Sequence, residues 1–212
     1  VIPHGTTTIY MDPHEICNVL GMDGVKLMAD DAKRTPLKEM ITYPSCVPAV
    51  PGFEDTGAFV GPAEIAEAMK MDDVVGLGEM MNFVGVINGT DHALGELAET
   101  QKADLMVTGH YSVPDTDRGL NAYVGAGVRC CHESTHVGDV IAKIRLGMYA
   151  QLRYGSAWLD LPAIAPAILE QGLDTRFVNL VSDDTHPHTI VEEGNIDRVL
   201  RVAVQCGINP IE

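Results

Sequence analysis

The chain has 212 residues, 46% of them hydrophobic, and a formal net charge of -16 at pH 7. This length fits one domain or most of one, and so acidic a chain is a poor partner for nucleic acid or for an anionic membrane surface. No apolar run reaches the roughly 18 residues that a membrane-spanning helix needs, so we expect no membrane partner.

Short apolar runs predict seven strands, with helix-type segments between them. In chain order, the strands are expected near residues 6–12, 39–46, 74–80, 104–110, 127–133, 148–155 and 176–184. The clearest helix signals are Pro62 at the start of 62–70, Ser134 or Thr135 as a cap and Gly147 as a stop for 134–147, and the apolar spacing of Ile196, Val199, Leu200, Ala203 and Val204 within 189–207.

Alternation of strands and helices predicts βα units and a parallel sheet. Seven units are one short of a (β/α)8 barrel, and an open doubly wound sheet is the competing architecture. No GxGxxG turn follows the first strand, which disfavours a dinucleotide-binding fold. We therefore predict an α/β fold of the TIM-barrel type, here incomplete, with residues 1–212 as one partial barrel domain.

The number and spacing of the cysteines indicate the cellular compartment in which the protein acts. The five cysteines, including the adjacent pair Cys130 and Cys131, lack the spacing of a disulfide framework. Free thiols fit a reducing compartment and nothing resembles a signal peptide, so we expect a cytoplasmic protein. Because the chain begins with Val1 close to a predicted strand, we interpret it as a piece of a longer protein.

Charged and imidazole side chains gather at the predicted strand ends, where a barrel carries its reactive groups. Imidazole and carboxylate ligands suit Zn, Fe or Mn, so this recurrence predicts a metal or acid–base site. The residues are Asp12, His14 and Glu15 after the first strand, Glu79 in the third, His110 in the fourth, His132 and Glu133 in the fifth, Arg153 and Ser156 in the sixth, and Asp183, Asp184 and His186 in the seventh.

Several of these residues have structural alternatives that the sequence leaves open. Asp12 and Glu15 could form a capping box at a helix start, and His110 could be a hydrogen-bonded turn residue. Asp183 and Asp184 could cap the last helix or lie in a solvated loop, and Glu133 could be a first-turn helix residue that the helix dipole favours.

Seven segments that span nearly the whole chain carry shared motifs: "PHGTTTIYMDPHEICNVLG", "PSCVPAVP", "VVGLGEMMNFVGV", "LNAYVGAGVRCCHEST", "LRYGSA", "SDDTHP" and "EEGNIDRVLRVAVQCGINP". They resemble the amidohydrolase superfamily and, within it, the adenine deaminases. The first and third segments contain the most specific motifs, DPHEI and GLGEMMNF.

This resemblance implies the hydrolytic deamination of adenine to hypoxanthine and ammonia by a hydroxide that two divalent metal ions activate. Mn or Fe(II) is the expected metal, with Zn as a further possibility. Glu79 matches the carboxylate that bridges the metals, His110 and His132 match metal ligands, and Asp183 matches a metal ligand that also carries protons. Further candidates are Glu133 in catalysis and His14, Glu15, Asp184, Arg153 and Ser156 in substrate binding.

The sequence also departs from the family pattern. No His-x-His pair precedes the first predicted strand, so the chain resembles a fragment that lacks the family's first strand and its C-terminal region. Cys131, Tyr111 and Thr185 stand where Asp, Ala and a basic residue are common. Another amidohydrolase of a related cyclic amidine or amide, or a non-catalytic barrel fragment, is the alternative. We expect a homo-oligomer that acts on a small molecule.

Overall fold

The computed structural model describes residues 1–171 and 173–211, and it divides into two compact units. We name them by their sheets. The four-stranded unit comprises Thr8–His110 and Ala122–Arg129, and the three-stranded unit comprises Val1–Thr7, Tyr111–Asn121 and Cys130–Glu212.

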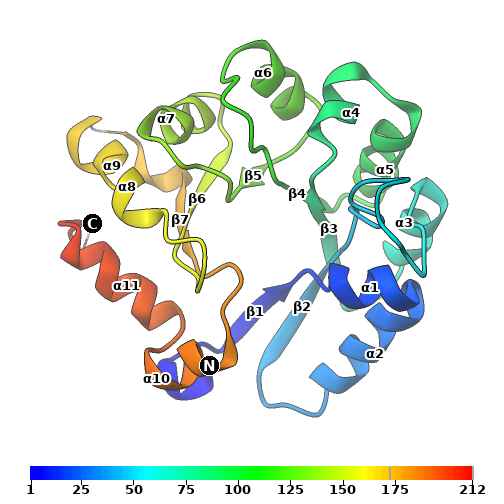
Figure 1. Cartoon of the computed structure of the whole chain (residues 1–212), viewed down its shortest axis with the longest axis horizontal. Coiled ribbons are helices and arrows are strands. Elements are labelled where there is room, and N and C mark those ends of the chain that lie inside the picture. The colour runs from blue at the N-terminus through cyan, green and yellow to red at the C-terminus, as the bar shows by residue number, and fades with distance from the viewer. Residues whose placement is uncertain (172, 212) are drawn as a thin grey trace. The chain divides into compact units, whose positions relative to one another are not determined.

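The sheet of the four-stranded unit has the order β1-β2-β3-β4, with every neighbouring pair parallel. Helix α2 packs against β2, and helix α5 packs against α3, β3 and β4 (Figure 1). The elements are β1 (Thr8–Met11), α1 (His14–Leu20), α2 (Met22–Ala32), β2 (Lys38–Tyr43), α3 (Pro62–Ala68), β3 (Val74–Met80), α4 (Phe83–Asn88), α5 (Asp91–Lys102) and β4 (Met106–Gly109).

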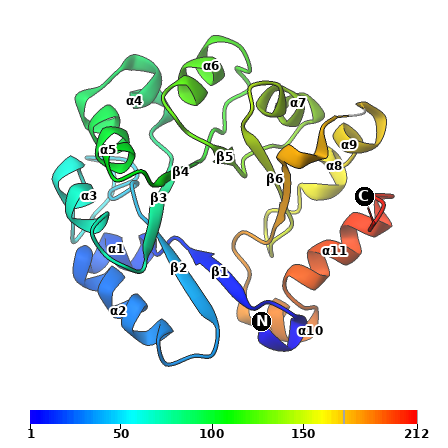
Figure 2. The same ribbon diagram turned by 180° about the vertical axis from the view of Figure 1, so that it is seen from behind.

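The sheet of the three-stranded unit has the order β5-β6-β7 and is also parallel. Helices α7 and α8 pack against β6, and α11 packs against β7 (Figure 2). The elements are η1 (Ile2–His4), β5 (Cys130–Cys131), α7 (Val137–Arg145), β6 (Tyr149–Arg153), α8 (Leu161–Ile164), α9 (Pro166–Gln171), η2 (Thr175–Phe177), β7 (Val178–Val181), α10 (Pro187–Glu192) and α11 (Ile196–Gln205); α6 (Arg118–Gly125) runs through the boundary between the units.

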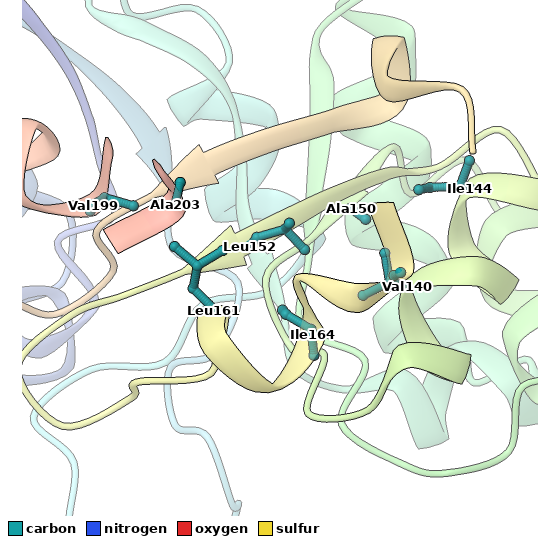
Figure 3. Close-up of a cluster of buried hydrophobic side chains, with 9 residues drawn as sticks. Val140, Ile144, Ala150, Leu152, Leu161, Ile164, Val199 and Ala203 are labelled. Carbon is teal, nitrogen blue, oxygen red and sulfur yellow. The ribbon is translucent and has the colours of Figure 1, made fainter. Parts of the chain in front are cut away.

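The core of the three-stranded unit lies between β6 and its helices (Figure 3). Ala150 and Leu152 alternate along β6 and therefore share one face of the sheet. Val199 and Ala203 are four residues apart on α11 and face the same cluster. The other members are Val140, Ile144, Leu161, Ile164 and Ala167.

The order of the strands confirms the predicted fold class, an α/β fold with the parallel strands of an incomplete TIM barrel. In both units each strand pairs with the next strand in the chain, whereas a doubly wound sheet reverses its order near the middle. The seven strands in the described part of the chain all coincide with or overlap their predicted ranges. No helix among the described residues has the length and hydrophobicity to cross a membrane.

Two helix boundaries differ from the prediction. Helix α7 begins after His136, and the Asp139 carboxylate accepts the backbone N–H groups of Thr135 and His136 at 3.1 and 3.0 Å. The predicted cap at Ser134 or Thr135 is therefore wrong, because the first turn is closed by a side chain inside the helix. Pro62 does open helix α3, as predicted.

The predicted helical stretch 189–207 is two helices. Helix α10 ends at Glu192 and α11 starts at Ile196, with Gly194 between them at a φ of 111°. This backbone conformation is open to glycine and breaks the helix. Of the predicted apolar stripe, Leu200 and Val204 are about half exposed, so part of that stripe faces solvent.

One buried acid in the four-stranded unit predicts a dependence of stability on pH. Glu96 in α5 is 1% exposed, and within the described residues neither carboxylate oxygen has a hydrogen-bond partner. The nearest base, His92, places Nε2 3.6 Å from Oε1. Burial raises the pKa of Glu96 from 4.5 to about 8, so the folded protein holds this acid neutral at pH values where the unfolded chain ionises it.

We expect the free energy of unfolding to fall as the pH rises from about 4.5 to about 8, because the unfolded state releases the Glu96 proton first. Glu96→Gln should remove this component, which is of the order of a few kcal/mol. Thermal unfolding between those pH values would measure it, with the exposed Glu67→Gln as the control. An unchanged pH dependence in Glu96→Gln would contradict the assignment.

Candidate functional site

Glu79 and His110 lie together at one edge of the four-stranded sheet. Glu79 is near the end of β3, and His110 directly follows the parallel strand β4. His110 Nδ1 lies 2.7 Å from Glu79 Oε2. The Tyr123 hydroxyl donates to the carbonyl of Met80 at 2.6 Å and accepts the His110 backbone N–H at 3.0 Å. Tyr123 therefore ties the ends of the two strands together.

Asp12 follows β1 and reaches the same edge of the sheet. Its Oδ2 accepts the backbone N–H of Glu79 at 2.8 Å. This approach requires glycine at position 78, since a Cβ there would lie 2.4 Å from Oδ2. Helix α1 has Pro13 as its N-cap and, among the described residues, no side-chain cap bond. The capping-box alternative for Asp12 and Glu15 is therefore wrong.

His14, the first residue of α1, lies between two carboxylates. Its Nδ1 is 3.4 Å from Asp12 Oδ1 and 3.5 Å from Glu79 Oε1, while its Nε2 is 3.6 Å from the largely exposed Glu15. The Asp12 carboxylate outweighs burial and raises the pKa of His14 to about 9. Burial in turn raises the pKa of Asp12.

Cys46, in the loop after β2, belongs to the same group. One ligand atom from each of His14, Cys46 and Glu79 lies within 4.8 Å of the others. The Cys46 side chain is buried, and burial raises the pKa of its thiol above the ordinary value. Next to it, the Ser45 hydroxyl donates to the carbonyl of Glu79 at 2.7 Å. The sequence analysis counted Cys46 only among the free thiols, although it lies in the loop after β2.

A second group of donors lies in the three-stranded unit. His132 and Glu133 follow β5, Asp183 follows β7, and one ligand atom from each lies within 4.8 Å of the others. Asp183 has a φ of 57°, a left-handed conformation that is uncommon outside glycine. Its Oδ1 accepts the backbone N–H of Asp184 at 2.6 Å. Strained backbone of this kind is frequent at functional sites.

Arg153, the last residue of β6, binds the carboxylates of this group. Its guanidinium is 3% exposed, Nη1 contacts Glu133 Oε1 and lies 3.0 Å from Asp183 Oδ2, and Nε donates to Asp160 at 2.7 Å. It also lies 5.0 Å from the centre of the Trp158 ring. Burial disfavours the charge, but hydrogen bonds to Asp160 and Glu133 raise the pKa of Arg153 overall. Arg153 is therefore a fixed cation that orients Glu133 and Asp183.

Lys143 fixes the loop that carries His132 and Glu133. Its side chain is 1% exposed, and Nζ donates to the carbonyl of Glu133 and, at 2.9 Å, to the hydroxyl of Ser134. The sequence analysis placed Lys143 within the predicted helix 134–147 and gave Tyr123 no role. The burial of Lys143 appears only in the structure, and it agrees with the rule that Lys is almost never fully buried unless it is paired.

The loops after β6 and β7 run in close contact. A Cβ on Gly155 would lie 2.4 Å from the carbonyl oxygen of Asp184 and 2.6 Å from that of Ser182, so this position accepts glycine alone. The Ser156 backbone N–H donates to the Asp184 carbonyl at 2.9 Å, and Ser156 Oγ accepts the N–H of His186 at 2.8 Å. The Asp184 side chain is exposed.

The donor chemistry of both groups fits a metal centre. Imidazole and carboxylate donors are suited to Zn, Fe or Mn, and a thiol is suited to Zn or Fe. In the four-stranded unit, two buried donor atoms, His14 Nδ1 and Asp12 Oδ1, have no hydrogen-bond partner among the described residues. Of the predicted ligands, Glu79 and His110 belong to that group, and His132 and Asp183 belong to the group in the three-stranded unit.

Comparison with known proteins identifies the family. The profile of the Amidohydrolase family matches residues 1–203, and the chain therefore belongs to the amidohydrolase family. Curated relatives that bear the name adenine deaminase match the whole chain. They include proteins of Clostridium botulinum (strain ATCC 19397 / Type A), Moorella thermoacetica and Paracoccus denitrificans, which are 61%, 53% and 49% identical over 211 residues.

These matches cover 100% of this chain and 35% of each relative. The chain thus spans about a third of the length of the curated relatives that it matches. The resemblance to adenine deaminases, and the interpretation of the chain as a fragment by comparison with them, are confirmed.

Because Arg153 contacts the carboxylates of Glu133, Asp160 and Asp183, we expect that removal of its charge greatly lowers the stability of the protein. Arg153→Met should lower the free energy of unfolding of the metal-free full-length protein by about 3–5 kcal/mol, because it leaves buried carboxylates without a counter-charge. Urea denaturation would measure this loss. The control is Arg176→Met, which removes an exposed partner of Asp174 and should cause no measurable change. Equal effects of the two substitutions would contradict the role of Arg153.

Proposed function

We propose that the full-length protein is an adenine deaminase, which hydrolyses adenine to hypoxanthine and ammonia. The observation that carries the proposal is the 61% identity over the whole chain to a Clostridium botulinum protein of that name. Two groups of metal-ligand side chains at strand ends support it, because such groups suit metal-assisted hydrolysis. Residues 1–212 would form part of one metal-dependent hydrolase domain.

Glu79, His110, His132 and Asp183 would hold the divalent metal ions. The proximity of the Glu79 and His110 side chains supports one part of this set, and the grouping of His132 with Asp183 supports the other. Mn and Fe(II) are the proposed metals, and Zn also suits these ligands. When bound, such ions supply Lewis acidity that brings the pKa of a water molecule toward neutrality.

The residues of the chain would carry out the proton transfers. As water adds to C6 of adenine, the Asp183 carboxylate accepts its proton and delivers a proton to the departing ammonia. Glu133 would orient a ring nitrogen of adenine, or protonate it after first taking up a proton itself. Arg153 contacts both carboxylates, so it holds them in the orientation that these transfers need.

Several finer features also belong to the proposal. His14, Glu15, Asp184, Arg153 and Ser156 are the candidate contacts to adenine, of which Glu15 and Asp184 have exposed side chains. The protein would act in the cytoplasm as a homo-oligomer, in purine salvage or adenine catabolism.

The direct test is an assay of the full-length protein loaded with Mn or Fe(II). Loss of adenine with equal release of ammonia, dependent on the metal, is the expected result. Absence of turnover with two bound metal ions per chain would overturn the assignment of adenine as the substrate. Related cyclic amidines and amides, assayed in parallel, would then identify another amidohydrolase activity.

The proposed role of Asp183 in proton transfer can be tested by the turnover of a variant without its carboxylate. Asp183→Asn should lower turnover at least about a hundredfold, because an amide cannot carry the proton between water and ammonia. Steady-state kinetics would measure the loss, with metal content and circular dichroism recorded for each variant. The exposed surface substitution Asp174→Asn is the control and should keep full activity. Turnover of Asp183→Asn near that of the parent protein would exclude Asp183 from the mechanism.

A further inference from the structure

We propose that Trp158 stacks against the purine ring of the substrate and so sets the position of the base beside Asp183. The inference rests on the proposed function, because it takes a purine base as the substrate. It adds a contact that neither the strand-end pattern nor the groups of metal-ligand side chains include, since Trp158 lies on the loop after β6 and carries no titratable group.

Trp158 is a large apolar side chain that the fold leaves in contact with solvent. It is 51% exposed, and the next residue, Leu159, is 46% exposed, whereas Leu152 and Leu161 on either side of this loop are fully buried. Loops at the carboxyl ends of barrel strands form the ligand-binding surface of this type of fold. The exposed indole therefore lies where contact with a small-molecule substrate is expected.

The backbone of this loop is fixed independently of the indole. The Gly155 N–H donates to the Trp158 carbonyl at 3.0 Å, which closes a turn, and the Ser156 N–H donates to the Asp184 carbonyl at 2.9 Å. From helix α11, Arg198 Nη1 donates to the carbonyl of Gly155 at 2.8 Å. The backbone that carries the indole is thus held in place before any ligand binds, as a preorganised binding surface requires.

The guanidinium of Arg153 lies over one face of the indole. Its Cζ is 5.0 Å from the ring centre, which is a cation–π contact. Because that face is covered, the exposed half of the side chain comprises mainly the ring edge and the opposite face. A planar base suits a free aromatic face, since every base has a π-face that can stack on it.

The same guanidinium connects the indole to the carboxylates of the proposed mechanism. Arg153 Nη1 contacts Glu133 Oε1 and lies 3.0 Å from Asp183 Oδ2. A single planar group therefore separates the ring of Trp158 from both carboxylates. A base stacked on the indole would present its edge to them, which is the orientation that attack at C6 and contact with a ring nitrogen need.

The competing explanation is that Trp158 only shields Arg153 from solvent. Such a cover would account for the cation–π contact but not for the exposed half of the ring. The two explanations differ in what a substitution changes. Loss of a cover lowers the stability of the fold, whereas loss of a stacking surface weakens substrate binding and leaves the fold intact.

The first test compares Trp158→Leu with Trp158→Phe in the metal-loaded full-length protein. We expect Trp158→Leu to raise KM for adenine about 5- to 100-fold, the span of base–aromatic stacking. The kcat should change less than about twofold, because stacking stabilises ground state and transition state alike. Trp158→Phe keeps an aromatic face and should restore most of the affinity. The control is Tyr149→Leu, which removes an exposed ring at the opposite end of β6 and should leave KM unchanged.

The second test observes the indole directly. In full-length protein labelled with fluorotryptophan, the fluorine NMR resonance that Trp158→Phe removes belongs to Trp158, and saturation with hypoxanthine or adenine should shift it. A resonance that neither purine moves overturns the proposal, even if Trp158→Leu fails to fold, and so does an unchanged KM in Trp158→Leu. A shift without adenine turnover overturns the proposed deaminase and leaves the stacking site standing, while turnover with an unmoved resonance does the reverse.

Discussion

Parallel pairing of strands in chain order is the constraint on which both groups of donors depend. Because neighbouring strands point the same way, the residues that follow them gather at one edge of each sheet. In the four-stranded unit this places the Asp12 carboxylate against the backbone of Glu79 and the Glu79 carboxylate against His110. In the other unit it brings Asp183, after β7, to Glu133 and Arg153.

Each group concentrates negative charge, and the two units neutralise it by different means. Buried Arg153 provides a permanent cation beside three carboxylates. In the four-stranded unit the cation is the His14 imidazole, whose charge depends on the carboxylates around it. A guanidinium remains charged in any surroundings, whereas an imidazole can give up its proton and become a metal ligand. The two groups therefore differ in whether their cation can lose its charge.

The sequence predicted the strands and their terminal side chains because both depend on local pattern. Glu79 and His110 could be found in this way, since each lies at the end of an apolar run. Tyr123 and Lys143 could not, because their roles lie in hydrogen bonds to carbonyls of distant segments or loops. The sequence analysis also missed a helix end that depends on one residue. Gly194, with its positive φ, separates α10 from α11 where a single helix was predicted.

Gly78 shows how a residue without functional groups can control a reactive one. The space beside its Cα is filled by the Asp12 carboxylate, which holds the backbone of Glu79 from two strands away. Even a single methyl group at position 78 would displace that carboxylate and release the end of β3. A substitution at position 78 would therefore act on Glu79 indirectly, through the Asp12 carboxylate that it displaces.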